Sequence, residues 1–276
     1  MSDDLLADFE VTDLRRLFTR RGTAGSTVVR AVDGVGLTVR PGEKLGIVGG
    51  SGSGKSTLVR MLMALMPPTS GSIRFRGEEI VGLPERRLGA LRRNVQMVFQ
   101  DPRSSLNPRM RVGRIIAEPL RSPILARQGE LPSNTPERVA EVMMKVGLDP
   151  GMASRYPHEF SGGQRQRIAI ARALAPSPTV LICDEAVSAL DVSVRAQVLN
   201  VIMDRVRDDG LTLLFVSHDI TLVRHLCDSL VVMRQGRIVE SGSAGQVCAD
   251  PRHPYTRELL ACVPTIKLTG PEPLDE

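Results

Sequence analysis

A nine-residue glycine-rich loop limits the possible folds of this chain more than any other segment does. The loop spans residues 49–57, follows a short apolar run at 44–48, and precedes apolar residues that recur at helical spacing from 58 to 66. Its Gly-x-x-x-x-Gly-Lys-Ser spacing is a Walker A motif in the strand, loop and helix context that this motif requires. The glycines let backbone N–H groups curl around a phosphate, and the helix adds its positive N-terminal end. The segment therefore predicts nucleotide binding within an α/β fold.

Two side chains of this loop have specific expected roles. Lys55 should bridge the β- and γ-phosphates of the nucleotide, and Ser56 should hold Mg²⁺. The simpler alternative is a glycine-rich turn before a helix, but the chain contains only four lysines, which disfavours a chance match. The residues expected to bind the nucleotide are Gly49, Gly50, Ser51, Gly52, Ser53, Gly54, Lys55, Ser56 and Thr57.

Apolar patterning along the rest of the chain predicts strands that alternate with helices. Strands are expected at 28–39, 72–76, 95–99, 179–183, 211–216, 230–233 and 237–240, and helices at 161–174, 194–206 and 220–226. Residues 20–26 are expected to form a loop, and the proline-interrupted stretch 102–136 precedes an amphipathic helix around 139–146. The alternation indicates a mainly parallel sheet that is covered on both faces, with a helical subdomain inserted in the middle of the chain.

Two carboxylates follow the apolar strand expected at 179–183. Asp184 and Glu185 therefore lie at the end of a buried strand, where parallel sheets bind their ligands. Because it is costly to bury two adjacent acids without partners or a task, we expect Asp184 to organise Mg²⁺ and Glu185 to orient and polarise the attacking water. Without the phosphate loop, an ordinary Asp-Glu pair at a helix cap would be the simpler interpretation.

Gln100 and His218 also follow expected strands and should reach the same edge of the sheet. His218 could bridge the γ-phosphate and the catalytic base, and Gln100 could contact Mg²⁺ or the attacking water. Each is a weak signal by itself, because a lone histidine is more often structural.

A second glycine-containing helix start lies at residues 161–164. The hydroxyl of Ser161 and the amides of Gly162 and Gly163, followed by Gln164, would form a second anion-binding helix end.

Composition and charge argue against several other classes of protein. The net charge is +5 and the pI is near 9.4, but the arginines are scattered and aromatic residues make up only 3%, which disfavours nucleic-acid binding. No apolar run approaches the roughly 18 residues of a membrane helix, and the acidic start lacks the order of a signal peptide, so we expect a cytosolic chain. Cysteines at 183, 227, 248 and 262 lack metal-binding spacing and are expected to be reduced thiols.

Together these motifs resemble the full set of an ABC transporter ATPase, in that family's order, from about residue 10 to residue 265. The set comprises the Walker A loop, Gln100, the Phe-Ser-Gly-Gly-Gln sequence at 160–164, Asp184 with Glu185, the Ser-Ala-Leu-Asp sequence at 188–191, and His218. The resemblance implies a P-loop ABC-type ATPase with a RecA-like core, an antiparallel β subdomain and an inserted α-helical subdomain. The implied boundaries are 8–245 for the ATPase domain, about 101–160 for the helical subdomain, and 246–276 for a C-terminal extension.

The same resemblance implies a head-to-tail dimer. ATP would lie between the Walker A loop of one subunit and the signature residues 161–164 of the other. Asp191, in the D-loop, would then lie near the opposing site and couple the two. The aromatic residue that stacks on adenine is expected to be Phe18, with Val28 as the alternative.

Three positions depart from the usual pattern of that family. The signature begins with Phe160 where Leu is commoner, Gly50 replaces a frequent Glu, and Ala186 follows Glu185 where Pro is usual. None of these departures removes an expected ligand or base.

Three separated segments, at 100–108, 188–198 and 252–260, resemble the ATPases of oligopeptide, dipeptide and nickel importers. In that family the chain uses ATP and Mg²⁺ to power uptake, paired with a second similar ATPase under two permeases that an extracytoplasmic substrate-binding protein feeds. The implied location is peripheral, on the cytoplasmic face of the inner membrane. Some relatives carry a cysteine cluster for an iron–sulfur centre, which Cys248 and Cys262 do not reproduce, so none is expected.

The sequence leaves alternatives for the cargo and for the class of ATPase. The cargo could be peptide, or nickel, opines, sugars or other small solutes. A soluble ABC ATPase of DNA repair or translation is disfavoured because there are no sustained heptads and only one Walker A motif. A non-catalytic nucleotide-binding subunit is disfavoured because no catalytic position is degenerate.

Overall fold

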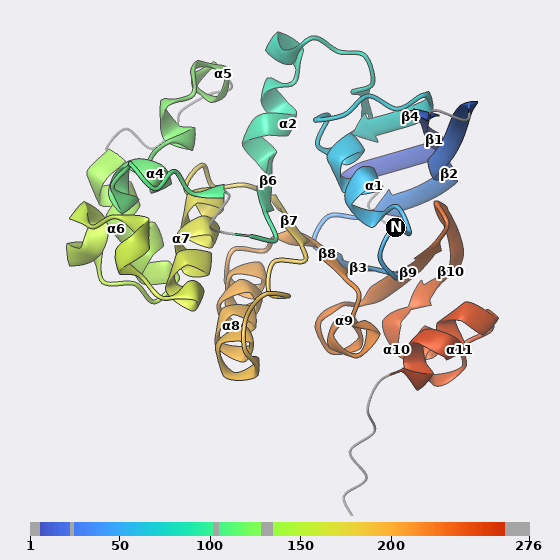
Figure 1. Cartoon of the computed structure of the whole chain (residues 1–276). Helices are drawn as coiled ribbons and strands as arrows, with labels where there is room; N and C mark the ends of the chain where they lie inside the picture. Colours follow the sequence, from blue (N-terminus) through green and yellow to red (C-terminus); the bar gives the residue numbers. More distant parts are fainter. Residues whose placement is uncertain (1–5, 23–24, 102–104, 128–134, 263–276) are drawn as a thin grey trace, which may run out of the picture.

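The computed structural model describes residues 6–22, 25–101, 105–127 and 135–262. Two sheets organise them, one of six strands in the order β10-β9-β3-β8-β7-β6 and one of four strands in the order β2-β1-β4-β5. Figure 1 shows the six-stranded sheet in the middle of the molecule, with the four-stranded sheet on one side and the helices α4 to α7 on the other.

The six-stranded sheet is parallel except for one edge strand. Strands β9, β3, β8, β7 and β6 run in parallel, and β10 pairs antiparallel with β9. This confirms the mainly parallel sheet predicted from the alternation of strands and helices. The bounds are β3 Lys44–Val48, β6 Val95–Val98, β7 Val180–Asp184, β8 Thr212–Ser217, β9 Ser229–Arg234 and β10 Arg237–Ser243.

Both faces of this sheet are buried, and successive residues of each strand serve opposite faces. In β8, Leu213 and Phe215 join one apolar cluster with helices α7, α8 and α9, whereas Leu214 and Val216 join a second cluster with helix α1 and the four-stranded sheet. Because side chains alternate along a strand, a strand buried on both sides needs a continuous apolar run, as β7 and β8 have.

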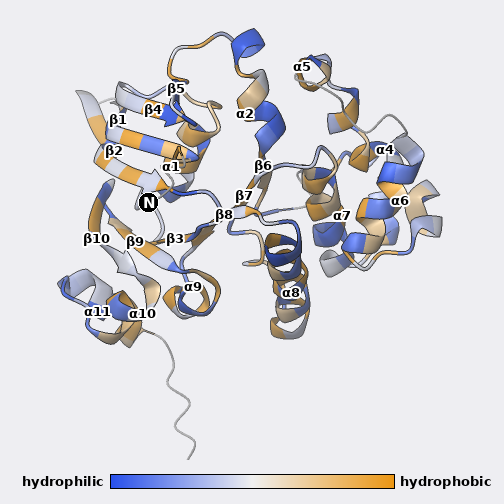
Figure 2. Ribbon diagram, turned by 180° about the vertical axis from the view of Figure 1, so that it is seen from behind, coloured by the Kyte–Doolittle hydropathy of each residue, from blue (hydrophilic) through white to orange (hydrophobic). Residues whose placement is uncertain are grey.

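The antiparallel sheet corrects the expectation of a loop at 20–26. Strands β1 and β2 form a long hairpin that pairs Arg20 with Thr27 and Gly22 with Gly25, and residues 23–24 lie outside the described part. Polar and apolar residues alternate along this hairpin (Figure 2), because only one of its faces has to be apolar. The backbone groups of each strand are satisfied by its partner strand. The bounds are β1 Phe9–Gly22, β2 Gly25–Val39, β4 Ser70–Phe75 and β5 Glu78–Glu79.

Helices cover the sheet and form the inserted segment. Helix α1 ends at Leu62, four residues short of the predicted apolar pattern, and Ala64 has a positive φ of 48° just after it. Helix α7 contacts α4, α6 and α8, and so joins the inserted helices to the parallel sheet. The helices are α1 Lys55–Leu62, α2 Gly89–Asn94, α4 Val112–Ile116, α5 Pro123–Ala126, α6 Thr135–Lys145, α7 Gly162–Leu174, α8 Val192–Asp208, α9 Ile220–Leu226, α10 Ala244–Ala249 and α11 Pro254–Ala261.

Four short 3₁₀ turns precede or connect these helices in the described residues. They are η1 Glu85–Arg87, η2 Pro119–Arg121, η3 Pro150–Ser154 and η4 Pro157–Glu159. Within the described residues, no helix has the length and apolar character needed to cross a membrane.

The C-terminal segment packs against the core of the fold. Helix α10 contacts β9, β10 and α9, and α11 contacts α9. The domain boundary predicted between residues 245 and 246 falls inside α10, which begins at Ala244. Residues 263–276 lie outside the described part.

Candidate nucleotide-binding and catalytic site

The glycine loop at 49–57 is held in shape by backbone contacts that leave no room for a side chain at Gly49 or Gly54. Gly54 has a φ of 105°, and a Cβ atom there would lie 2.2 Å from the carbonyl oxygen of Ala31 in β2. On the other side, the N–H of Gly236, in the turn between β9 and β10, donates to the carbonyl of Ser53 at 2.9 Å. The loop is therefore fixed between β2 and the β9–β10 turn, and glycine is required at 54 because the backbone is left-handed there.

Lys55 points back into the loop from the first residue of α1. Its Nζ atom donates to the carbonyl oxygens of Gly49 at 2.7 Å and Gly50 at 3.0 Å, and the side chain is only 5% exposed. Burial lowers the pKa of this ammonium group, and the nearby carboxylates of Glu185 and Asp184 oppose that shift. The charge thus lies inside the loop, where an anionic ligand would relieve its desolvation.

Ser56 and Asp184 meet at the ends of α1 and β7. The hydroxyl of Ser56 donates to Oδ1 of Asp184 at 3.1 Å. Burial raises the pKa of Asp184, and the bond from Ser56 offsets part of that rise. A hydroxyl and a carboxylate are hard oxygen ligands of the kind that Mg²⁺ prefers, so this pair fits the predicted metal site.

Glu185 lies beside the buried ammonium of Lys55, with a strained backbone. Its φ is 49°, which is uncommon for a residue other than glycine, and its N–H donates to the carbonyl of Val216 at 3.0 Å. Its carboxylate lies 4.0 Å from Nζ of Lys55, 3.6 Å from Nδ1 of His218 and 3.3 Å from Nε2 of Gln100. The three strand ends predicted to converge therefore do so around this one carboxylate.

Ser188 joins this group, although the residue patterns assigned it no role. Its hydroxyl donates to the carbonyl of Glu185 at 3.0 Å and lies 3.4 Å from Nε2 of Gln100. The signal was present, since Ser188 opens the Ser-Ala-Leu-Asp sequence at 188–191. Its connection to Gln100, 88 residues away, depends on the pairing of β6 with β7.

The second glycine helix start is built as a capped helix end. Ser161 is the N-cap of α7: its hydroxyl accepts from the N–H of Gln164 at 3.3 Å, and the Gln164 side chain accepts from the N–H of Ser161 at 3.0 Å. A Cβ atom on Gly163 would lie 2.3 Å from a methyl carbon of Val194, and one on Gly162 would lie 3.8 Å from Leu190. The signature segment therefore packs against the start of α8.

Asp191 caps that neighbouring helix. Its carboxylate accepts from the N–H of Val194 at 3.0 Å, and this bond lowers its pKa. The next residue, Val192, is 80% exposed. The structure thus brings Asp191 and the signature segment together, but it places α7 and the loop-bearing α1 apart, as both views show (Figures 1 and 2).

The adenine-stacking position stays a prediction. Phe18 lies in β1 opposite Val29, and the guanidinium of Arg16 lies 4.8 Å from the centre of its ring. Val28, the alternative, is 55% exposed in β2.

The four cysteines are free thiols with very different surroundings. Cys183 and Cys227 are buried, which raises both pKa values, that of Cys227 to about 12, whereas Cys262 is exposed. Since the thiolate is the reactive form, we expect iodoacetamide at pH 8 to label Cys262 at least about a hundredfold faster than either buried thiol. Peptide mass spectrometry over time measures these rates, with urea-unfolded protein as the control. Rapid labelling of Cys183 in the folded chain would contradict the burial described here.

The amino-acid sequence of this chain is similar to those of known proteins. The family model described as "ABC transporter" matches residues 32–188. The chain is similar to the oligopeptide transport ATP-binding protein OppF of Escherichia coli (strain K12), with 48% identity over 95% of this chain and 76% of that protein. It is also similar to the oligopeptide transport ATP-binding protein AppF of Bacillus subtilis (strain 168), with 46% identity over 95% of this chain and 79% of that protein.

A solved structure shares the fold as well. The dimeric post-hydrolysis state of the ATP-binding cassette MJ0796, bound to ADP and Pi, superposes with a TM-score of 0.74 at 27% identity, over 86% of this chain and 98% of that chain.

Proposed function

The chain belongs to the ABC transporter family of ATP-binding proteins, and on that premise we propose that it is the ATP-hydrolysing subunit of an importer of peptides. The observation that carries the proposal is the convergence of Lys55, at the start of α1, with Asp184 and Glu185, at the end of β7, where the Lys55 ammonium lies 4.0 Å from the Glu185 carboxylate. Peptide is the favoured cargo because the similar proteins from Escherichia coli and Bacillus subtilis are named oligopeptide transport ATP-binding proteins.

The loop and the strand ends divide the chemistry between binding and hydrolysis. The amides of 49–57 bind the phosphates of ATP, and Lys55 moves its ammonium from the Gly49 and Gly50 carbonyls to the β- and γ-phosphates. Ser56 and Asp184, together with Gln100, would hold Mg²⁺, which neutralises phosphate charge when bound. These assignments account for two groups whose burial is otherwise costly, the ammonium of Lys55 and the carboxylate of Asp184.

Glu185 acts as the base in the hydrolysis step. The oxygen of a water molecule bonds to the γ-phosphorus while the bond from that phosphorus to the β–γ bridging oxygen breaks, which yields ADP and inorganic phosphate. The Glu185 carboxylate accepts the proton of the water and passes it on to phosphate, while His218 and Gln100, at 3.6 and 3.3 Å, keep that carboxylate in position.

The signature segment completes the site of a second subunit. Ser161, Gly162, Gly163 and Gln164 lie beside α8 and away from the loop of their own chain, so in a head-to-tail dimer they reach the γ-phosphate bound by the partner ATPase. The exposed Val192, next to Asp191, supplies apolar surface for that contact. Two permeases and an extracytoplasmic substrate-binding protein complete the importer, and the chain docks peripherally on the cytoplasmic side of the membrane.

Purification of the tagged chain from native membranes in mild detergent, followed by mass spectrometry of its companions, tests this assignment. We expect two permeases, a second similar ATPase and a binding protein. Recovery of soluble nucleic-acid or ribosomal proteins alone would leave the ATPase chemistry intact and overturn the transport role. A binding protein that takes Ni²⁺ and no peptide would overturn the cargo.

A further inference from the structure

The C-terminal segment touches the nucleotide loop through one side chain. Tyr255, the second residue of α11, places its hydroxyl oxygen 2.7 Å from the backbone nitrogen of Gly50, whose N–H donates to it. A Cβ atom on Gly50 would lie 3.0 Å from that oxygen, which is tighter than an ordinary contact. Glycine at position 50 therefore leaves room for this tyrosine.

The peptide group that Tyr255 holds is the one that holds Lys55. The N–H of Gly50 and the carbonyl of Gly49 belong to the same planar peptide unit and point in opposite directions. Tyr255 accepts from its N–H at 2.7 Å, and Lys55 Nζ donates to its carbonyl at 2.7 Å. A hydrogen bond at one end of a peptide group orients and polarises the other, so the tyrosine sets the direction of the carbonyl that receives the Lys55 ammonium.

The start of α11 is fixed firmly enough to transmit this contact. The side chain of Glu240, in β10, accepts from the N–H groups of Arg252 at 2.8 Å and His253 at 3.1 Å. The ring nitrogen Nδ1 of His253 accepts from the N–H of Tyr255 at 3.1 Å and so caps the helix. These bonds fix the backbone of Arg252, His253 and Tyr255 itself.

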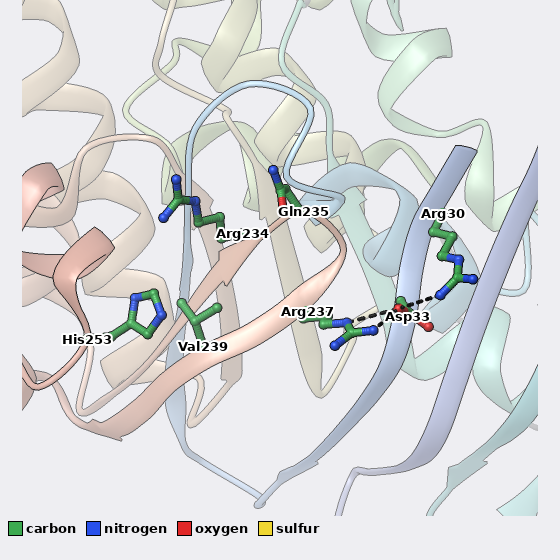
Figure 3. Close-up of a pocket in the computed structure, with 7 residues that line it drawn as sticks. All are labelled: Arg30, Asp33, Arg234, Gln235, Arg237, Val239 and His253. Atoms are coloured by element: carbon green, nitrogen blue, oxygen red, sulfur yellow. Dashed lines mark hydrogen bonds and ion pairs between the residues drawn. The ribbon is translucent and has the colours of Figure 1, made fainter. Parts of the chain in front are cut away.

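The β9–β10 hairpin connects the C-terminal segment to the glycine loop at a second point, Ser53. Arg234, at the end of β9, places its guanidinium 4.7 Å from the centre of the Tyr255 ring. Two residues later, the N–H of Gly236 donates to the carbonyl of Ser53. Arg234, which contacts the Tyr255 ring, and His253 both border a cleft of about 540 Å³ (Figure 3). The glycine loop is therefore hydrogen-bonded at Gly50 to the C-terminal segment and at Ser53 to the β9–β10 hairpin.

We propose that Tyr255 is a positioning residue for the nucleotide loop, and that it couples the docking of the C-terminal segment to the affinity for ATP. The inference rests on the proposed binding of ATP at 49–57. With the hydroxyl in place, the 49–50 peptide at the start of the loop is fixed before the phosphates arrive, which lowers the cost of ordering the loop on binding. Coupling is reciprocal, so bound ATP strengthens the docking of α11 by the same factor.

Tyr255→Phe removes only the hydroxyl and keeps the ring under Arg234. A hydrogen bond contributes about 0.5–1.5 kcal/mol, which corresponds to a rise of about two- to tenfold in the Kd for Mg-ATP. We expect kcat at saturating ATP in the assembled complex to stay within about twofold, since the reacting groups around Glu185 are untouched. Tyr156→Phe, at the only other tyrosine, is the matched control and should leave both values unchanged.

Tyrosine labelled with ¹³C at Cζ gives a readout that a loss of stability would not produce. The full-length chain has two tyrosines, so two resonances are expected, and Tyr156→Phe assigns them. Saturating Mg-ATP should shift the Tyr255 resonance and leave that of Tyr156 in place. A Tyr255→Phe protein that binds ATP as tightly as the wild type, or a Tyr255 resonance that ATP does not move, overturns the inference while wild-type ATP binding preserves the proposed function. Failure of the wild-type chain to bind ATP overturns both.

Discussion

Replacing Glu185 by Gln should lower the kcat of ATP hydrolysis by about 10²- to 10⁴-fold, the range that a positioned general base contributes. The amide keeps the size of the side chain and can still contact Gln100 and the Lys55 region, but it cannot accept the proton of the attacking water. ATP binding should persist, because Lys55, Ser56 and the loop amides are unchanged. The measurement is steady-state phosphate release by the membrane complex, alongside equilibrium binding of a fluorescent ATP analogue.

The control for this variant is Glu78→Gln, an exposed position in the short strand β5 on the antiparallel sheet. It removes the same charge at a distance from the site and should hydrolyse ATP at the wild-type rate. Substantial residual turnover in Glu185→Gln would mean that another group accepts the proton. The role of Glu185 would then be structural, in the left-handed turn where its φ is 49°.

Replacing Lys55 by Met should weaken ATP binding by about 10- to 100-fold, because charge-assisted hydrogen bonds contribute about 1.5–3 kcal/mol. The Lys55 side chain is only 5% exposed, and methionine fills a similar volume, so the substitution should leave no cavity. Burial lowers the pKa of this lysine because its charge is desolvated, which offsets part of what its hydrogen bonds contribute, so the free energy of unfolding should fall only a little. Isothermal titration with Mg-ATP and thermal unfolding measure the two effects.

Lys145→Met is the matched control for that prediction. Lys145 pairs with Glu141 and Asp209 at the end of α6, away from the loop, so its loss should leave ATP affinity unchanged. If Lys55→Met bound ATP as the wild type does, the phosphates would have to be held without this ammonium. Together with Glu185→Gln, the pair of variants separates binding from chemistry.

The parallel sheet and the converging strand ends were predictable from the sequence because both depend on local patterns. Continuous apolar runs mark β7 and β8 as strands buried on both faces, and the residue after each such run must emerge at the same edge. These local patterns suffice to place Asp184, Glu185 and His218 at one edge of the sheet. The glycine spacing of the loop, likewise, is a local requirement of its backbone.

Contacts between distant parts of the chain were not predictable in the same way. The hydrogen bond between Gly50 and Tyr255 joins residues 205 positions apart, and nothing in either segment indicates the other. Polar residues at 20–22 suggested a loop, but the partner strand β2 supplies the backbone hydrogen bonds that keep β1 extended. Helix α1 ends at Leu62 in a left-handed turn at Ala64, where the N–H of Leu65 donates back to the carbonyl of Arg60 at 2.9 Å, and apolar periodicity does not record such a turn.

Peptide uptake by the reconstituted importer tests the central claim most directly. The complex that copurifies with this chain is placed in liposomes, and uptake of a radiolabelled peptide is measured together with phosphate release, with and without the binding protein. We expect the peptide-loaded binding protein to stimulate hydrolysis, and uptake to require ATP and to disappear with Glu185→Gln. ATP hydrolysis that ignores the loaded binding protein, with no peptide accumulated, would contradict the account.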